Sequence, residues 1–203
     1  MKIMTAAFAL ICIPSVWADD FQDKVDGALA LQNQQAMIER LEEEAYRGNL
    51  KAAYRLGLFH RAGEGVSKDA AAAYERFEQA GEPDWIRDRY KLGLPEAQYE
   101  AGVMLRDGVG VEADAEEAAT WFERAAEQGH ARAQLALAEL YLAGRGVDQD
   151  HERAYVWASL AGRNDSGLRG EAAAVRAAAR SKLQSTALRA ADREVYAWTA
   201  DQR

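Results

Sequence analysis

Three histidines are the residues of this chain best suited to acid–base or metal chemistry. His60, His130 and His151 lie far apart, and no two have the i, i+4 spacing that places two ligands on one helix face. We therefore predict no metal site. His60 is expected to pack in place of an aromatic ring, whereas His130 and His151 are expected to be solvated.

Nucleophilic catalysis is also disfavoured by the residues present. Cys12 is the only cysteine, and it lies in an N-terminal segment that we expect to be removed. No serine stands in the strand–turn–helix setting of a nucleophile elbow. Consecutive carboxylates such as Glu42-Glu43-Glu44 point around a helix and do not converge. These features predict a protein that is not an enzyme and needs no cofactor.

A glycine-rich string is the most regular motif in the sequence. Gly-x-Gly-Val begins at Gly63, Gly108 and Gly144. The strings look like phosphate-binding loops, but no Lys-Ser/Thr follows them and they recur three times. Their glycines suit a structural role, since the first can end a helix in the left-handed conformation and the second permits a tight reversal.

Small and acidic residues recur at fixed distances from these strings. They are Ala52, Ala97 and Ala133 before the strings, Asp69, Asp114 and Asp150 after them, and then Ala73, Ala118 and Ala154. Each aspartate can cap a following helix. The unit is therefore helix, glycine loop, helix, and we expect the indoles of Trp121 and Trp157 to fill the space between helices.

The spacing of the copies shows where the repeat is interrupted. Gly108 and Gly144 are 36 residues apart, whereas Gly63 and Gly108 are 45 apart, so the first junction holds nine extra residues. Insertions in repeat proteins form loops on one face, often the binding face. Trp85 and Tyr90 of this insert either wedge between the first two units or contact a partner.

The repeat resembles the Sel-1-like repeat (SLR) family, a relative of the tetratricopeptide repeat (TPR). The resemblance rests on Ala133 to Tyr141, Gly144-x-Gly146-Val147, Asp150, Ala154, Trp157 and Ala161-Gly162, and it recurs at 97–129 and more loosely at 52–81. It implies an all-α, right-handed superhelical solenoid of antiparallel helix pairs with a C-terminal helical cap. In the first copy, Arg76 stands where the indole belongs.

Five regions follow from this reading. They are a signal peptide at 1–18, a helical lead at 19–48, repeats at 49–163 (about 49–84, 94–129 and 130–163), an insert near 83–93, and capping helices at 164–203. The signal peptide is predicted from Lys2, an apolar stretch and the Val16/Ala18 pair, with cleavage after Ala18. The protein is then periplasmic or secreted, with no transmembrane span left after cleavage.

The charge of the chain limits its partners. Its net charge is −8, and removal of the signal peptide takes away one cation, Lys2. Without a basic run the chain is not expected to bind nucleic acid, which needs Lys and Arg to neutralise phosphates. We expect a monomer that binds another protein.

One face of the first helix in each unit is the candidate binding surface. It lies opposite the core positions at 100° per residue, and resemblance to TPR arrays implies that it lines a groove. The candidates are Tyr54, Arg55, Leu58, Arg61, Tyr99, Glu100, Val103, Arg106, Glu139 and Leu142, together with Trp85 and Tyr90 of the insert. Tyr and Arg are frequent binding hot spots. The alternative is that these residues pack against the neighbouring unit.

The function predicted from the residues and the resemblance is that of a non-enzymatic adaptor or scaffold of the bacterial envelope. Envelope assembly, signalling regulation and host contact all remain open. One alternative is a glycan- or peptidoglycan-associated factor, which would need converging acids, and only Glu100, Asp107 and Glu139 are available. The other is a structural subunit that self-associates through the ends of the solenoid.

Overall fold

The computed structural model describes residues 33–82 and 92–201. The predicted signal peptide, the predicted cleavage site and the insert residues Trp85 and Tyr90 lie outside the described residues. The chain divides into two units, 1–40 and 41–203. A helix covers residues 33–46 and so crosses this boundary. The architecture below is that of the second unit.

The described part of the second unit is helical throughout apart from its connecting turns. Its elements are α2 (Leu50–Ala62), α3 (Ala70–Gly81), α4 (Pro95–Asp107), α5 (Ala115–Glu127), α6 (Ala131–Ala143), α7 (His151–Asn164), the 3-10 helix η1 (Ser166–Leu168), α8 (Arg169–Arg180) and α9 (Ser185–Asp201).

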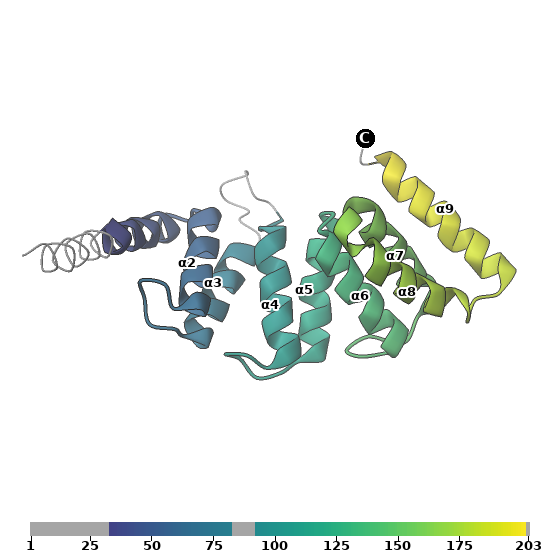
Figure 1. Ribbon diagram of the computed structural model, residues 1–203, viewed down its shortest axis with the longest axis horizontal. Coiled ribbons are helices and arrows are strands. Elements are labelled where there is room, and N and C mark those ends of the chain that lie inside the picture. Colours follow the sequence, from purple (N-terminus) through teal and green to yellow (C-terminus); the bar gives the residue numbers. More distant parts are fainter. Residues whose placement is uncertain (1–32, 83–91, 202–203) are drawn as a thin grey trace, which may run out of the picture. The chain divides into compact units, whose positions relative to one another are not determined.

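The helices form pairs that stack side by side (Figure 1). Within the pairs, α2 packs on α3, α4 on α5 and α6 on α7; between the pairs, α3 packs on α4 and α5 on α6. Each helix therefore contacts elements that are near it in sequence, as in other solenoids. The predicted all-α repeat solenoid is confirmed.

The glycines and aspartates of the repeat have the structural roles predicted for them. Gly108 ends α4 in the left-handed conformation with φ 66°, and its N–H donates to the carbonyl of Met104. Asp114 then caps α5, because its Oδ1 accepts hydrogen bonds from the N–H groups of Glu116 and Glu117, each at 2.9 Å.

The second glycine of the loop permits contact with the preceding unit. Gly110 has φ 78°, and a Cβ built on it would lie 2.3 Å from the carbonyl oxygen of Ala70, the first residue of α3. Gly146 stands in the same way against Ala115 of α5, at 2.0 Å. A side chain at either position would push neighbouring units apart, so both positions require glycine.

Inside the pairs, a missing side chain on one helix makes room for a ring on the other. A Cβ on Gly57 would lie 2.6 Å from the ring of Phe77, and one on Gly102 would lie 2.7 Å from the ring of Phe122. Both rings are fully buried. The third pair has alanines at both equivalent positions, and both are buried there as well.

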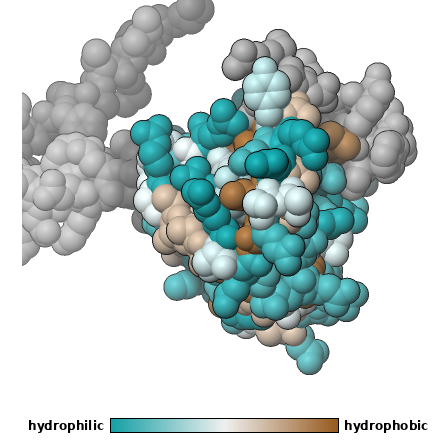
Figure 2. Space-filling model, turned by 90° about the vertical axis from the view of Figure 1, so that its right-hand side faces the viewer, coloured by the Kyte–Doolittle hydropathy of each residue, from teal (hydrophilic) through white to brown (hydrophobic). Residues whose placement is uncertain are grey.

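The C-terminal helices cover the end of the array. α8 packs on α7 and α6, while α9 packs on α7. The Tyr155 hydroxyl donates to Asp192 Oδ1 at 2.8 Å, and the rings of Trp157 and Trp198 meet edge to face at 5.3 Å. Seen from this end, the surface is largely hydrophilic with small hydrophobic areas between (Figure 2).

The two indoles of the repeat differ in burial. Trp121 is 3% exposed and lies against Gly81 of the preceding unit, as expected for a ring between helices. Trp157 is only partly buried, and its exposed edge is covered by Trp198 of α9. The cap therefore adds to the burial of this ring, which remains partly exposed.

Candidate functional site

The candidate site lies on the exposed side of the first helices α2, α4 and α6. We call it the first-helix face, and its members are Tyr54, Arg55, Leu58, Arg61, Tyr99, Glu100, Val103, Arg106, Glu139 and Leu142. Arg55, Arg61 and Glu139 are exposed, and the others are half-buried. The helix period predicted this partial exposure, because residues opposite the core must face solvent.

A hollow of about 330 Å³ lies on the first-helix face. Its lining residues are Tyr99 and Arg106 of α4, Arg132, Leu135, Ala136 and Glu139 of α6, and Leu168 and Glu171 of η1 and α8. Three of the predicted residues, Tyr99, Arg106 and Glu139, therefore meet in one place.

The charges around this hollow are mixed. Arg106 donates to Asp107 through Nε at 2.7 Å and Nη2 at 2.9 Å. These hydrogen bonds raise the pKa of Arg106 and lower the pKa of Asp107. Partial desolvation of the carboxyl group raises the pKa of Glu139. The hollow therefore offers both cations and carboxylates to a ligand, together with the ring of Tyr99.

Tyr99 belongs to both the packing and the surface. Its ring lies 5.9 Å from that of Phe122 in its own unit and 4.9 Å from that of His130 in the next unit. Burial is the main cause that raises the pKa of its hydroxyl, and the nearby Glu100 adds to the effect. Tyr54 packs in the same way on Phe77, at 5.7 Å. One side of the Tyr99 ring therefore packs against the neighbouring unit, which is the alternative considered above.

An ion pair links the first two units across the first-helix face. Arg61 of α2 donates to Glu100 of α4, and the Arg61 guanidinium also lies 5.6 Å from the centre of the Phe77 ring. Glu100 and Asp107 are thus each paired with an arginine. Of the three acids considered for a glycan-associated site, only Glu139 lines the hollow, where it is joined by Glu171.

The remaining candidates contribute less to the hollow. Leu58, Val103 and Leu142 are partly buried and pack against the core, so only part of their apolar surface faces outward. Arg55 is exposed on α2. None of these four lines the hollow on the first-helix face.

Besides Leu135 and Ala136 of α6, three further lining residues were not among the candidates. Arg132 directly precedes the repeat alanine, and Leu168 and Glu171 lie beyond the last repeat. The periodicity of the repeat gave no signal for Leu168 and Glu171, because they come from the cap. Arg132 could have been found from its place one residue before Ala133, at the start of α6.

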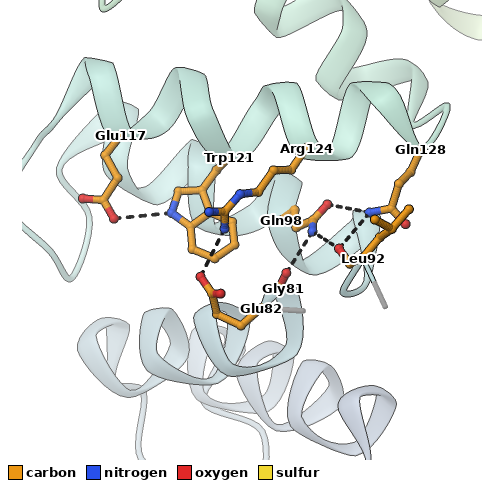
Figure 3. Close-up of polar contacts among 8 residues, drawn as sticks. All are labelled: Gly81, Glu82, Leu92, Gln98, Glu117, Trp121, Arg124 and Gln128. Carbon is orange, nitrogen blue, oxygen red and sulfur yellow. Dashed lines mark hydrogen bonds and ion pairs between the residues drawn. The ribbon is translucent and has the colours of Figure 1, made fainter. Parts of the chain in front are cut away.

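Sequence reasoning also missed the side chains that fix the first junction. Gln98 of α4 is fully buried and donates through Nε2 to the carbonyl of Gly81 at 2.8 Å (Figure 3). Its amide oxygen accepts a hydrogen bond from Gln128 Nε2, also at 2.8 Å. The polar side chain is thus satisfied by partners on both units.

The second junction uses the same arrangement. Gln134 Nε2 donates to the carbonyl of Ala126 at 3.1 Å, and its amide oxygen accepts from Asn164 Nδ2 at 3.0 Å. Gln98 and Gln134 each directly follow the repeat alanine. A glutamine in an apolar position of two copies was the available signal.

The insert leaves the first junction in the same register as the second. The Leu94 N–H donates to the carbonyl of Ala80 at 2.9 Å, as the His130 N–H does to that of Ala125 at 3.0 Å. Since α3 packs directly on α4, residues 83–91 are additional to a junction that is already closed. Their own contacts lie outside the described residues.

Polar contacts surround Trp121 on the other side of this junction (Figure 3). The Arg124 guanidinium lies 4.9 Å from the centre of the Trp121 ring and pairs with Glu82 of the first unit at 3.1 Å. The indole Nε1 lies 3.5 Å from Glu117 Oε1. The ring is thus held between a glycine of α3 and charged groups of both units.

The histidines differ in part from the prediction. His130 is half-buried and not solvated, because its Nδ1 accepts the N–H of Ala133 at 3.2 Å and so caps α6. Burial lowers its pKa. His151 is also half-buried, at the start of α7. His60 is half-buried in the position expected of an aromatic ring.

The described residues hold neither a group of metal ligands nor a helix that could span a membrane. In residues 33–82 and 92–201, no three His, Cys, Asp or Glu side chains are grouped so that they could hold a metal ion. No helix within the same ranges has the length and apolar character needed to cross a bilayer.

Comparison with known proteins defines the class. The model of the Sel1 repeat family matches residues 50–82, 95–130 and 131–166, which is more than half of the chain. The chain belongs to the Sel1 repeat family, as its residues indicated. Proteins of this family are generally protein-interaction scaffolds, and the fold is typically non-enzymatic.

Two solved structures are similar to this chain. A Sel1 repeat protein from Oxalobacter formigenes is 26% identical with a TM-score of 0.58, over 70% of this chain and 54% of that one. The second is c5321, a protective antigen present in uropathogenic Escherichia coli strains displaying an SLR fold. It is 28% identical with a TM-score of 0.50, over 79% of this chain and 40% of that one. The matched part is thus about half of the first relative and two-fifths of the second. No curated protein matches the chain.

Proposed function

We propose that this protein is an exported adaptor that binds a segment of another protein in the hollow of the first-helix face. The observation that carries the proposal is the meeting of Tyr99, Arg106 and Glu139, from two repeat units, around a hollow of about 330 Å³. This volume lies at the lower end of the roughly 300–1,000 Å³ that is typical of ligand pockets. A half-exposed tyrosine with arginines at its edge is typical of a binding hot spot.

The mixed charge of the hollow favours a peptide segment over a polyanion. Arg106 and Arg132 stand beside Glu139 and Glu171, so a ligand with a single sign of charge would meet repulsion. A segment with both donors and carboxylates can satisfy all four groups. Membership of a family of protein-interaction scaffolds supports the same partner class.

Replacing Arg106 and Glu139, one from each of two repeat units, tests this proposal. Arg106→Ala combined with Glu139→Ala is expected to weaken binding of the native partner by about 2 kcal/mol, the cost typical of hot-spot residues. The partner is first captured by a photo-crosslinking residue at 139 in the native host. Titration calorimetry of the purified pair then compares the double variant with the parent chain.

A matched double variant controls for general effects of the substitutions. Thr120→Ala with Glu127→Ala changes two exposed side chains of α5 that do not line the hollow. It is expected to bind as the parent does. If the two double variants bind equally well while both remain folded, the interface lies elsewhere. Concentration-dependent light scattering of the purified chain would instead favour the self-associating subunit.

Export is a separate part of the proposal. It is supported by the apolar stretch after Lys2 and by Val16 and Ala18 before Asp19. Intact-mass measurement of the chain from its native host is expected to give a protein that begins at Asp19. A mass that retains residues 1–18 would contradict cleavage.

A further inference from the structure

A second hollow lies at the C-terminal end of the array, between α7 and α8. We call it the terminal hollow; it measures about 410 Å³. Its lining includes Ser159, Gly162 and Arg163 of α7, and Arg169, Ala173 and Arg176 of α8. No residue is shared with the hollow of the first-helix face.

The preceding units of the array show what kind of element fits the terminal hollow. Gly162 occupies the place in α7 that Gly81 occupies in α3. A Cβ on Gly81 would lie 2.8 Å from the indole of Trp121, because this side chain of α5 reaches across to α3. Among the described residues, a Cβ on Gly162 has only Ala172 and Arg169 of α8 within 4 Å. The position that a following second helix would take is open.

The last helix of the chain takes only part of this position. α9 covers the first half of α7, where Tyr155 bonds to Asp192 as Tyr74 of α3 bonds to Glu117 of α5, and Trp157 meets Trp198. No residue of α9 lines the terminal hollow. α8 packs instead on α6, α7 and η1. α8 thus stands where the first helix of a fourth unit would stand, without a second helix packed along it.

The charge of the terminal hollow is basic although the chain is acidic. Arg163, Arg169 and Arg176 line it, and no carboxylate does. In the described ranges, no ion pair joins these three arginines to an acid. The net charge of the whole chain is −8. Such a cluster attracts a ligand that carries carboxylates.

Arg163 has the opposite charge to the residue at the equivalent position of the first unit. Arg163 stands in α7 where Glu82 stands just after α3. Glu82 pairs with Arg124 of the following second helix at 3.1 Å. A helix that packed on α7 in the same way would therefore need a carboxylate at the position of Arg124.

We propose that the terminal hollow binds an amphipathic helix of a partner protein, with a bulky ring over Gly162 and carboxylates facing the three arginines. The helix completes the fourth repeat unit from outside the chain. This site goes beyond the function proposed for the first-helix face and does not depend on it.

A second copy of the chain fits less well. The helix 33–46 matches a second helix of the repeat in sequence, but it carries Arg40 at the position of Trp121. That cation would face Arg169 and Arg176, and like charges brought together in an interface are repulsive. The acidic helix of another protein is the better occupant.

A synthetic peptide with the sequence of α5 and its flanking residues tests the site. Residues 113–128 form an acidic helix with Trp121 at the required position. The probe is this peptide with Arg124→Glu and a fluorescein label, titrated with the chain from Asp19 and followed by anisotropy. It is expected to bind about threefold or more tightly than the unmodified peptide, because an ion pair with Arg163 replaces a repulsion. A peptide with Trp121→Ala is expected to bind about tenfold more weakly.

Matched variants of the chain locate the binding. Ala173→Trp fills the terminal hollow, whereas Ala174→Trp adds the same group to an exposed position of α8 outside it. Arg176→Glu and Arg180→Glu form a second pair, since Arg180 does not line the hollow. We expect at least a tenfold loss of affinity in the first member of each pair and little change in the second.

Charge exchange keeps the proposal testable if a variant fails to fold. Arg163→Glu is expected to reverse the preference between the two peptides, so that the unmodified one binds more tightly. Absence of peptide binding, equal binding by the Ala173 and Ala174 variants, or an unchanged preference in Arg163→Glu would overturn the proposal. Self-association that Ala173→Trp abolishes would also overturn it, because the occupant is then a second copy. Arg106→Ala with Glu139→Ala is expected to leave peptide binding intact, which separates this test from that of the first-helix face.

Discussion

The junction between the first two units and the junction between the second and third differ in length but not in construction. The first has nine more residues in its connection. In both, a glutamine of the first helix donates to a backbone carbonyl near the end of the preceding second helix, Gln98 to Gly81 and Gln134 to Ala126. The stacking of units is thus set by contacts across the junction and not by the length of the loop.

The largest expected effect separates the two indoles. Trp121→Ala removes a ring that is 3% exposed and is expected to destabilise the protein by about 3–5 kcal/mol, the cost of a large cavity. Trp157→Ala is expected to cost less, because Trp157 is only half-buried. Urea denaturation of both variants measures the difference. Equal costs would show that α9 buries Trp157 as fully as α3 buries Trp121.

The two glutamines test directly whether both junctions contribute equally to stability. Gln98→Ala and Gln134→Ala each remove a buried amide that hydrogen-bonds across the junction, which costs about 1–3 kcal/mol. We expect similar losses of unfolding free energy at both junctions. A cost at Gln98 well below that at Gln134 would mean that the longer connection weakens the first junction.

The stability of the second junction is expected to depend more strongly on pH than the stability of the first. α6 is capped by His130, whereas α4 begins with Leu94 and Pro95 and has no side-chain cap. Burial lowers the pKa of His130, so the unfolded chain binds a proton more readily than the folded chain. The free energy of unfolding is therefore greatest above about pH 6.5, the ordinary pKa of histidine, and falls as the pH drops below it.

An asparagine at this position is the control for the pH effect. His130→Asn keeps a capping side chain but cannot titrate. Thermal melts between about pH 5 and pH 8 are expected to show a smaller change of the melting temperature with pH in the variant. Identical profiles would mean that His130 does not contribute to the pH dependence.

The smallest effect is expected from shortening the first connection. Deletion of residues 83–91 joins Glu82 to Leu92, which matches the direct step from Glu127 to Gln128 in the second junction. The free energy of unfolding is expected to change by only about 1 kcal/mol, because the entropy cost of closing a loop grows slowly with its length. A loss above about 2 kcal/mol in urea denaturation would show that the insert packs between the units.

The repeat could be predicted because the structural roles of its residues depend on neighbours that are close in sequence. Gly108 ends a helix and Asp114 caps the next, and both roles depend on neighbours within a few residues. The exposed side of the first helices followed from the helix period alone. Three of its predicted members, Tyr99, Arg106 and Glu139, do meet around one hollow.

The features that escaped prediction depend on stacking. The carbonyl that accepts from Gln98 lies 17 residues away in sequence, and only the packing of α4 on α3 brings the two together. Leu168 and Glu171 reach the hollow from the cap, which has no repeat pattern to place it. The capping role of His130 could not be predicted, because histidine is an uncommon helix cap.

The paired glycines and rings of the first two units bear on how such an array grows. Gly102 leaves room for Phe122, while the third unit has Ala138 and Ala158 at the same two positions. A hybrid of α6 with α5 would press a methyl group into the phenylalanine ring, and a hybrid of α4 with α7 would leave a void. Recombination that involves the third unit therefore preserves the packing only when it exchanges a whole helix pair.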